Sequence, residues 1–143
     1  MQAKEYLGQV SRINRMIKNK VSEIAQLKEI AINISAIDTE ERVQTSPDFD
    51  KIGKMFVRID EEEDKLNSLI FEYIELKNKI ISQIEGIKEE TFYCVLFSRY
   101  VENKTFEKIA IDMQYSFRQI TRLHGKALLA FDKMYGEEYK NMS

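Results

Sequence analysis

The sequence has few of the residues that interrupt helices or build chemical sites. One proline and five glycines among 143 residues leave few places where a helix must end. The single cysteine excludes an intramolecular disulfide and a multi-cysteine zinc site, and the single histidine excludes a metal site built on two histidines. There is also no paired set of catalytic side chains and no glycine-rich loop to hold phosphates. We therefore expect neither an enzyme nor a protein with a bound cofactor.

Long hydrophobic runs are also missing. No stretch approaches the ~18–20 apolar residues of a membrane span, and the first ten residues have no apolar core of the kind that marks a signal peptide. With 43% hydrophobic and 32% charged residues, the composition is typical of a soluble, helix-rich protein. We expect an all-α cytoplasmic protein that does not contact membranes.

Two long segments carry the periodicity of helices. Apolar residues recur at every seventh position through residues 3–35 and again through residues 49–85, and only Lys20 breaks the first series. Between these segments, residues 38–47 are polar and end in the only proline, which indicates a loop. The two segments predict a long antiparallel helical hairpin, similar to a coiled coil, over residues 1–87.

Several apolar side chains of the hairpin fall outside its seam. They are Ile30, Ile32, Ile37, Phe71 and Ile81. Because an isolated pair of helices buries only one stripe on each helix, these residues are available to meet a second copy of the protein or another partner. A homodimer through the hairpin is one expectation, and packing of the hairpin on the C-terminal domain is the alternative.

An acidic run at residues 60–64 resembles a cluster of metal ligands or acid–base groups in composition only. Consecutive positions on a helix point around the cylinder, so these carboxylates do not converge on one point. We expect a solvated face. The functional alternative is a contact for a basic patch on RNA polymerase or on a partner subunit.

The remaining residues, 88–143, predict a small helix-turn-helix domain. Thr105 and Ser116 each stand where an N-cap is needed, just before an apolar-periodic segment. Gln114 and Tyr115 form the expected turn between a short helix and a longer second helix at about residues 116–133. The predicted core of this domain consists of Phe92, Val95, Leu96, Tyr100, Phe106, Ile109, Ile120, Leu123, Leu128 and Phe131.

The charge of the second helix contrasts with that of the whole chain, which has a formal net charge of −2. Residues 114–133 hold four Lys or Arg residues against one acid, Asp132. A short capped helix before a longer basic one suits the major groove of DNA, where the second helix meets base edges and phosphates. Double-stranded DNA is therefore the expected partner.

Two stretches of this region carry a resemblance to a known family. They read Arg99-Tyr100-Val101-Glu102-x-Lys104-Thr105-x-Glu107-x-Ile109-Ala110 and Tyr115-Ser116-x-Arg118-Gln119-Ile120-x-Arg122-Leu123-His124-x-Lys126-Ala127-Leu128. The pattern is similar to region 4 of bacterial sigma factors, which reads the promoter −35 element. It resembles more closely the RinA/ArpU-type transcriptional regulators of phages and mobile elements, which are also similar to residues 3–7 and 42–46 here.

The candidate DNA-binding residues lie on the second helix and are Ser116, Phe117, Arg118, Gln119, Thr121, Arg122, His124 and Lys126. The resemblance places base contacts near Phe117, Arg118, Thr121 and Arg122. By the same resemblance, Lys126 lies near a phosphate. Two of the residues have a second interpretation: Phe117 either touches a thymine methyl group or covers the small core, and His124, expected on the exposed side, is either a DNA contact or a surface histidine.

The expected function is a sequence-specific transcriptional regulator of a phage or mobile genetic element, such as a late-gene activator. The resemblance also leaves room for direct contact with RNA polymerase. The alternative is a helical adaptor or anti-sigma-like protein that binds RNA polymerase or a sigma factor without reading DNA. The two hypotheses differ in whether Arg118, Arg122 and Lys126 face DNA phosphates, because such contacts make binding fall steeply with salt.

Overall fold

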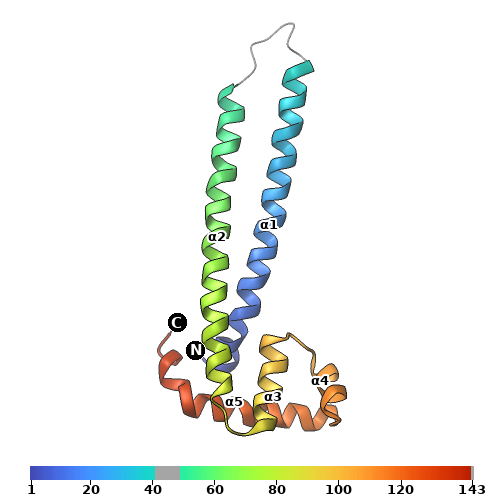
Figure 1. Ribbon diagram of the computed structural model, residues 1–143, viewed down its shortest axis with the longest axis vertical. Coiled ribbons are helices and arrows are strands. Elements are labelled where there is room, and N and C mark those ends of the chain that lie inside the picture. The colour runs from blue at the N-terminus through green and yellow to red at the C-terminus, as the bar shows by residue number, and fades with distance from the viewer. Residues whose placement is uncertain (41–48, 143) are drawn as a thin grey trace. The chain divides into compact units, whose positions relative to one another are not determined.

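The computed structural model describes residues 1–40 and 49–142, and every regular element in them is helical. The helices are α1 (Ala3–Glu40), α2 (Phe49–Glu85), α3 (Glu90–Leu96), the π-helical turn η1 (Phe97–Val101), α4 (Phe106–Met113) and α5 (Phe117–Tyr139) (Figure 1). This confirms the all-α class, with a long antiparallel helical hairpin followed in the chain by a helix-turn-helix.

The ends of the two long helices differ slightly from expectation. Helix α2 has the predicted bounds, whereas α1 continues past Ser35 to Glu40, so the start of the predicted loop is helical. No glycine or proline interrupts residues 36–40, and nothing in the backbone stops the helix there. The remainder of the predicted loop, residues 41–47, lies outside the described residues.

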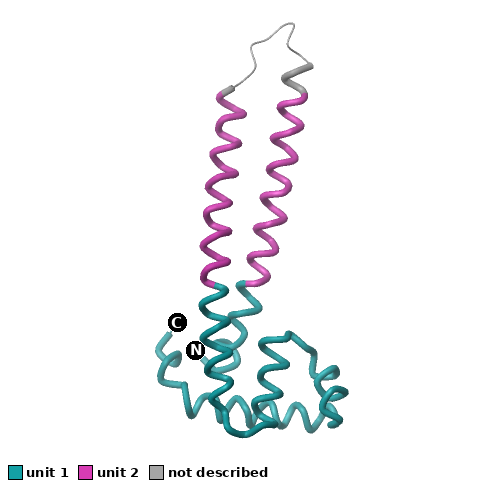
Figure 2. The backbone as a smooth tube through the Cα atoms, viewed as in Figure 1, with its two compact units in different colours: residues 1–13, 73–143 teal, residues 14–72 magenta. Residues whose placement is uncertain are grey.

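The chain forms two compact units that do not divide at residue 87, where the sequence suggested a boundary. One unit comprises Met1–Ile13 and Tyr73–Ser143, and the other comprises Asn14–Glu72 (Figure 2). The first turns of α1 and the last turns of α2 thus belong with the C-terminal helices. Their apolar side chains join the core of that domain, so its packing extends beyond the helix-turn-helix.

The second unit is a two-helix seam with an ion pair in it. Ile24, Ala31 and Ile59 are buried along the seam. Lys20 Nζ lies 2.6 Å from a carboxylate oxygen of Glu62, which is only 7% exposed. The residue that broke the apolar series is therefore paired across the hairpin. The expectation of a solvated acidic face at residues 60–64 is wrong for Glu62, because this position faces the seam.

The first unit has a large apolar core made by residues distant in sequence. Its buried members are Ala3, Tyr6, Leu7, Val10, Ile80, Ile84, Ile87, Leu96, Tyr100, Ala127, Phe131 and Tyr139. The rings of Tyr6 and Tyr139 stack with centroids 4.7 Å apart, and the Tyr6 hydroxyl donates to Gln83 Oε1 at 2.8 Å. Because this hydrogen bond satisfies the buried hydroxyl, burying the polar atom has little cost in folding free energy.

A smaller core lies within the helix-turn-helix. Val95, Ile109, Ala110 and Ile120 are buried there. Phe106, Met113 and Leu123 pack around them. All ten core residues expected from the sequence belong to one of the two clusters, which confirms that part of the prediction.

The C-terminal end is more ordered than the sequence suggested. The second helix was predicted to end near residue 133, but α5 continues to Tyr139. The side chain of Tyr139 is fully buried and its hydroxyl donates to Asp132 Oδ1 at 2.7 Å. The packing of this tyrosine in the core accounts for a helix more than one turn longer than predicted.

Candidate nucleic-acid interface

Both helices of the helix-turn-helix begin at the predicted caps. The Thr105 hydroxyl accepts a hydrogen bond from the Lys108 backbone N–H at 3.2 Å, without the reciprocal half of a capping box. At the second helix the box is complete: Ser116 Oγ accepts from Gln119 N–H, and Gln119 Oε1 accepts from Ser116 N–H. These bonds satisfy backbone groups that a helix end leaves open and fix where α5 starts.

The turn between α4 and α5 contains a residue in the left-handed backbone conformation. Gln114 has φ 60° and ψ 40°, a conformation that usually falls to glycine or asparagine. The backbone N–H of Tyr115 donates to the Ala110 carbonyl oxygen at 3.0 Å and completes the turn. The predicted turn is confirmed, although it uses a residue that is strained in this conformation.

The face of α5 turned away from the core is basic. Arg118, Gln119, Arg122 and Lys126 are exposed, and they recur at three- and four-residue steps along one side of the helix. Within the described part of the chain, no ion pair involves Arg118, Arg122 or Lys126. Three cations are thus presented to solvent without internal neutralisation.

The charged side chains in and just before the neighbouring helix α4 pair with one another. Asp112 lies 3.0 Å from Lys104 Nζ and 3.1 Å from Lys108 Nζ. The hydrogen bonds from these lysines hold the pKa of the Asp112 carboxyl below its usual value. The charges of α4 therefore largely cancel one another, so the basic character of the helix-turn-helix is concentrated on α5.

A depression of about 200 Å³ opens on this basic face. It is lined by Tyr115, Gln119, Arg122, Leu123 and Lys126. Two cations, an amide and an aromatic ring surround a space large enough for a phosphate or the edge of a base, and an anion there would meet both positive charges. Tyr115 and Leu123 were not among the predicted contact residues. The former was interpreted only as part of the turn and the latter only as core.

Three of the predicted contact residues already make hydrogen bonds within the fold. The side-chain oxygens of Ser116 and Gln119 are used in the capping box, which leaves the Gln119 amide nitrogen as the group able to donate outward. Thr121 is half-buried and its hydroxyl donates to the Arg118 carbonyl oxygen at 2.8 Å. Of the predicted contact residues on this face, Arg118, Arg122 and Lys126 are the ones whose side chains make no hydrogen bond or ion pair within the described part of the chain.

For Phe117 the structure confirms one of the two interpretations, that it covers the small core, and does not test contact with DNA. One edge packs against Phe106, with ring centroids 6.3 Å apart, and the side chain remains 49% exposed. The packing edge covers the rim of the small core. The exposed edge is available for an apolar contact such as a thymine methyl group.

The expected position of His124 on the exposed side is wrong. Its side chain is 8% exposed, and Nε2 lies 2.7 Å from the Tyr100 hydroxyl. The ring also packs edge-on against Phe106 at 4.9 Å. Burial, with added repulsion from Arg99 and Lys4, lowers the pKa of His124 to about 4, so the imidazole is neutral at pH 7. It cannot act as a phosphate-binding cation and is removed from the set of candidate contacts.

Arg99 positions the segment that leads into α4. Its guanidinium lies 4.5 Å from the Phe106 ring centroid, and Nη1 donates to the Lys104 carbonyl oxygen at 3.1 Å. These contacts fix the chain near Asn103, whose φ of 56° marks a sharp reversal. Arg99 is part of the family-like pattern, but only its contacts reveal that it supports the fold of the domain.

The described residues contain no arrangement suited to metal binding, since no three His, Cys, Asp or Glu side chains gather in a group. The free thiol of Cys94 is half-buried, and burial raises its pKa. No described helix combines the length and apolar character that crossing a membrane requires.

No family model, curated protein or solved structure matches the chain. The similarity to sigma region 4 and to the RinA/ArpU-type regulators therefore stays a prediction.

Proposed function

We propose that the protein is a DNA-binding transcriptional regulator of a phage or mobile genetic element, acting in the cytoplasm of a bacterial cell, and that α5 is its recognition helix. The observation that carries the proposal is the set of three exposed cations on α5, Arg118, Arg122 and Lys126, that have no ion-pair partner among the described residues. Cations that neutralise backbone phosphates supply a large part of protein–DNA affinity.

The geometry around these cations supports the same function. Helix α4 is about two turns long and ends in a tight turn, and α5 starts at a complete capping box. In a helix-turn-helix, the second helix enters the major groove by its N-terminal end. That end carries Phe117 and Arg118, and the depression beside Arg122 follows within the next turn. The N-terminal residues of α5 would meet base edges, and Lys126 would meet a phosphate.

The test is DNA binding by the full chain across a salt series, measured by fluorescence anisotropy on fragments from the protein's own genomic neighbourhood and on random DNA. We expect saturable binding that prefers one fragment. The Arg118→Ala/Arg122→Ala variant should bind more weakly on all DNA. It should also lower the slope of log affinity against log salt by up to about 2, because each lost phosphate contact removes roughly 0.9 from that slope.

The matched control removes two exposed cations from the hairpin instead. The Arg15→Ala/Lys18→Ala variant changes the net charge by the same amount, so a simple loss of overall positive charge would weaken both variants equally. Unchanged binding by this control assigns the effect to α5. If the wild-type protein binds no fragment better than random DNA at low salt, the proposal fails and a protein-binding adaptor becomes the better explanation.

A further inference from the structure

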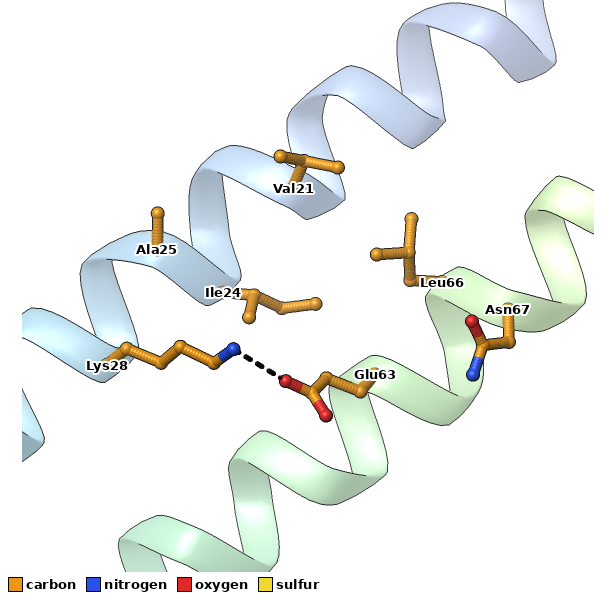
Figure 3. A pocket seen from close by; sticks show the side chains of 7 residues that line it. All are labelled: Val21, Ile24, Ala25, Lys28, Glu63, Leu66 and Asn67. Atoms are coloured by element: carbon orange, nitrogen blue, oxygen red, sulfur yellow. Dashed lines mark ion pairs between the residues drawn. The ribbon is translucent and has the colours of Figure 1, made fainter.

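One side of the Asn14–Glu72 unit carries an open groove between α1 and α2. The groove has a volume of about 380 Å³ and is lined by Val21, Ile24, Ala25, Lys28, Glu63, Leu66 and Asn67 (Figure 3). Ile24 and Leu66 belong to the seam, and the other residues border it. Lys28 and Glu63 form an ion pair across the groove, with Nζ and Oε1 2.9 Å apart.

The residues bordering the groove continue in both directions as one apolar face. On α1, Val21, Ala25, Lys28 and Ile32 recur at three- and four-residue steps and share one side of the helix. On α2, Phe56, Glu63 and Ile70 are seven residues apart and share one side as well. We call these seven residues, with Asn67, the groove face.

The apolar side chains of the groove face are largely exposed to solvent. Val21 is 50% exposed, Ile32 69% and Phe56 53%. Among the described side chains of this unit, the buried apolar ones are Ile24, Ala31 and Ile59, all in the seam. Contiguous exposed apolar surface of this kind marks an interaction site, because leaving it in water costs free energy.

The charges of the groove face identify the partner. The face holds one cation, Lys28, and one anion, Glu63, which form an ion pair with each other (Figure 3), and in the sequence apolar residues of the face precede and follow each of them. Such a face has no net charge with which to select an acidic or a basic partner, but it is complementary to itself. A two-fold axis parallel to the helices would set Lys28 of one copy beside Glu63 of the other.

We propose that the groove face binds the same face of a second copy of this chain and forms a four-helix bundle. The part of α2 in this unit, residues 49–72, is the shorter of the two and at 1.5 Å per residue gives a face ~35 Å long, and two adjacent helices are ~20 Å wide. Each copy would thus bury on the order of 700 Å², or about 1,400 Å² in total, which is within the range of specific stable interfaces. The dimer follows from the hairpin alone and does not depend on DNA binding.

The experiment is sedimentation velocity on the full chain over a concentration series in the micromolar range. We expect the wild type to sediment as a dimer. Val21→Glu/Ile32→Glu should sediment as a monomer, because four carboxylates would be forced into one apolar interface. Ile30→Glu is the matched control: Ile30 is 47% exposed on the same helix, but it points away from the groove face, so this variant should stay dimeric.

If Val21→Glu/Ile32→Glu loses its helical circular dichroism signal, a second pair of variants, with altered charges at Lys28 and Glu63, tests the proposal. Lys28→Glu alone should weaken the dimer by placing like charges together, and Lys28→Glu/Glu63→Lys should restore it. A wild-type protein that remains monomeric throughout the concentration series overturns the proposal. So does dissociation by Ile30→Glu to the same extent as by Val21→Glu/Ile32→Glu.

Discussion

The Tyr100 hydroxyl and His124 Nε2 lie 2.7 Å apart in the interior of the helix-turn-helix unit and join η1 to α5. Burial raises the pKa of Tyr100 to about 12 and lowers that of His124 to about 4. Both groups are therefore neutral at pH 7 and share one hydrogen bond, which satisfies two polar atoms that the core would otherwise leave without a partner. The contact holds the middle of α5 against η1 and thereby fixes which side of α5 faces outward.

The first prediction concerns stability against pH. The unfolded histidine takes up a proton below its ordinary pKa of 6.5, whereas folded His124 stays neutral down to about 4. The unfolded state thus binds more protons in this window, and the free energy of unfolding falls as the pH is lowered through it, by on the order of 3 kcal/mol. Urea denaturation across the window measures this. His124→Gln should remove most of the decline, and an unchanged decline would show that carboxylates cause it.

The second prediction concerns the strained turn residue. Gln114→Gly should raise the free energy of unfolding by about 1 kcal/mol, because glycine adopts φ 60° without the steric cost borne by a side chain. Glu107→Gly, at an exposed position in the first turn of α4, provides the contrast and should lower stability by about 1 kcal/mol, because glycine disfavours the helix and the acidic side chain favours its N-terminus. Chemical denaturation of both variants gives the comparison. Destabilisation by both would mean that the Gln114 side chain contributes contacts that outweigh its strain.

The third prediction compares two glycines. A Cβ added at Gly86 would overlap the Tyr135 hydroxyl and lie 3.2 Å from the Gln83 carbonyl oxygen, whereas a Cβ at Gly125 would meet nothing within 4 Å. Gly86→Ala should therefore destabilise by about 1–3 kcal/mol, and Gly125→Ala should stabilise by about 0.5–1 kcal/mol. Thermal unfolding measures both effects.

The cause of the Gly86 effect can be isolated by removing the obstructing atom. In a Tyr135→Phe background the hydroxyl is gone, and Gly86→Ala should then cost much less. If the cost is the same in both backgrounds, the backbone at Gly86 and not the approach of Tyr135 is what requires glycine.

The fourth prediction concerns the ion pair in the hairpin seam. Lys20→Met should lower the unfolding midpoint, because it leaves the buried Glu62 carboxylate without its partner across the seam. Lys20→Met/Glu62→Leu should recover at least the wild-type midpoint, since apolar residues can fill the same space. Lys108→Met, which breaks the exposed pair with Asp112 on α4, should have a much smaller effect. Equal losses for Lys20→Met and Lys108→Met would show that burial does not strengthen the seam pair.

The features that depend on neighbours in the chain were predictable. Heptad spacing identified the seam, and the N-caps at Thr105 and Ser116 were found because a cap satisfies backbone groups only three residues away. The turn at Gln114 could be located for the same reason. Its left-handed conformation could not, because glutamine has no preference for it.

The environment of His124 was misjudged, although its spacing held the signal. It lies four residues after Ile120 and three before Ala127, both of which are buried, so it falls on the same stripe of α5. Its polarity led to the opposite expectation. A buried imidazole needs a hydrogen-bond partner, and Tyr100 reaches it only through the π-helical turn, which no periodicity in the sequence indicates.

The sequence by itself determined the helices, most of their ends, the seam of the hairpin and the basic face of α5, because each of these follows from residues within a few turns of one another. The tertiary structure alone decided that Tyr6 and Tyr139 stack in one core, that Lys20 meets Glu62, and that both ends of the hairpin belong with the C-terminal helices. Those contacts join residues far apart in the chain. Their pairing depends on how whole helices pack, which local spacing does not specify.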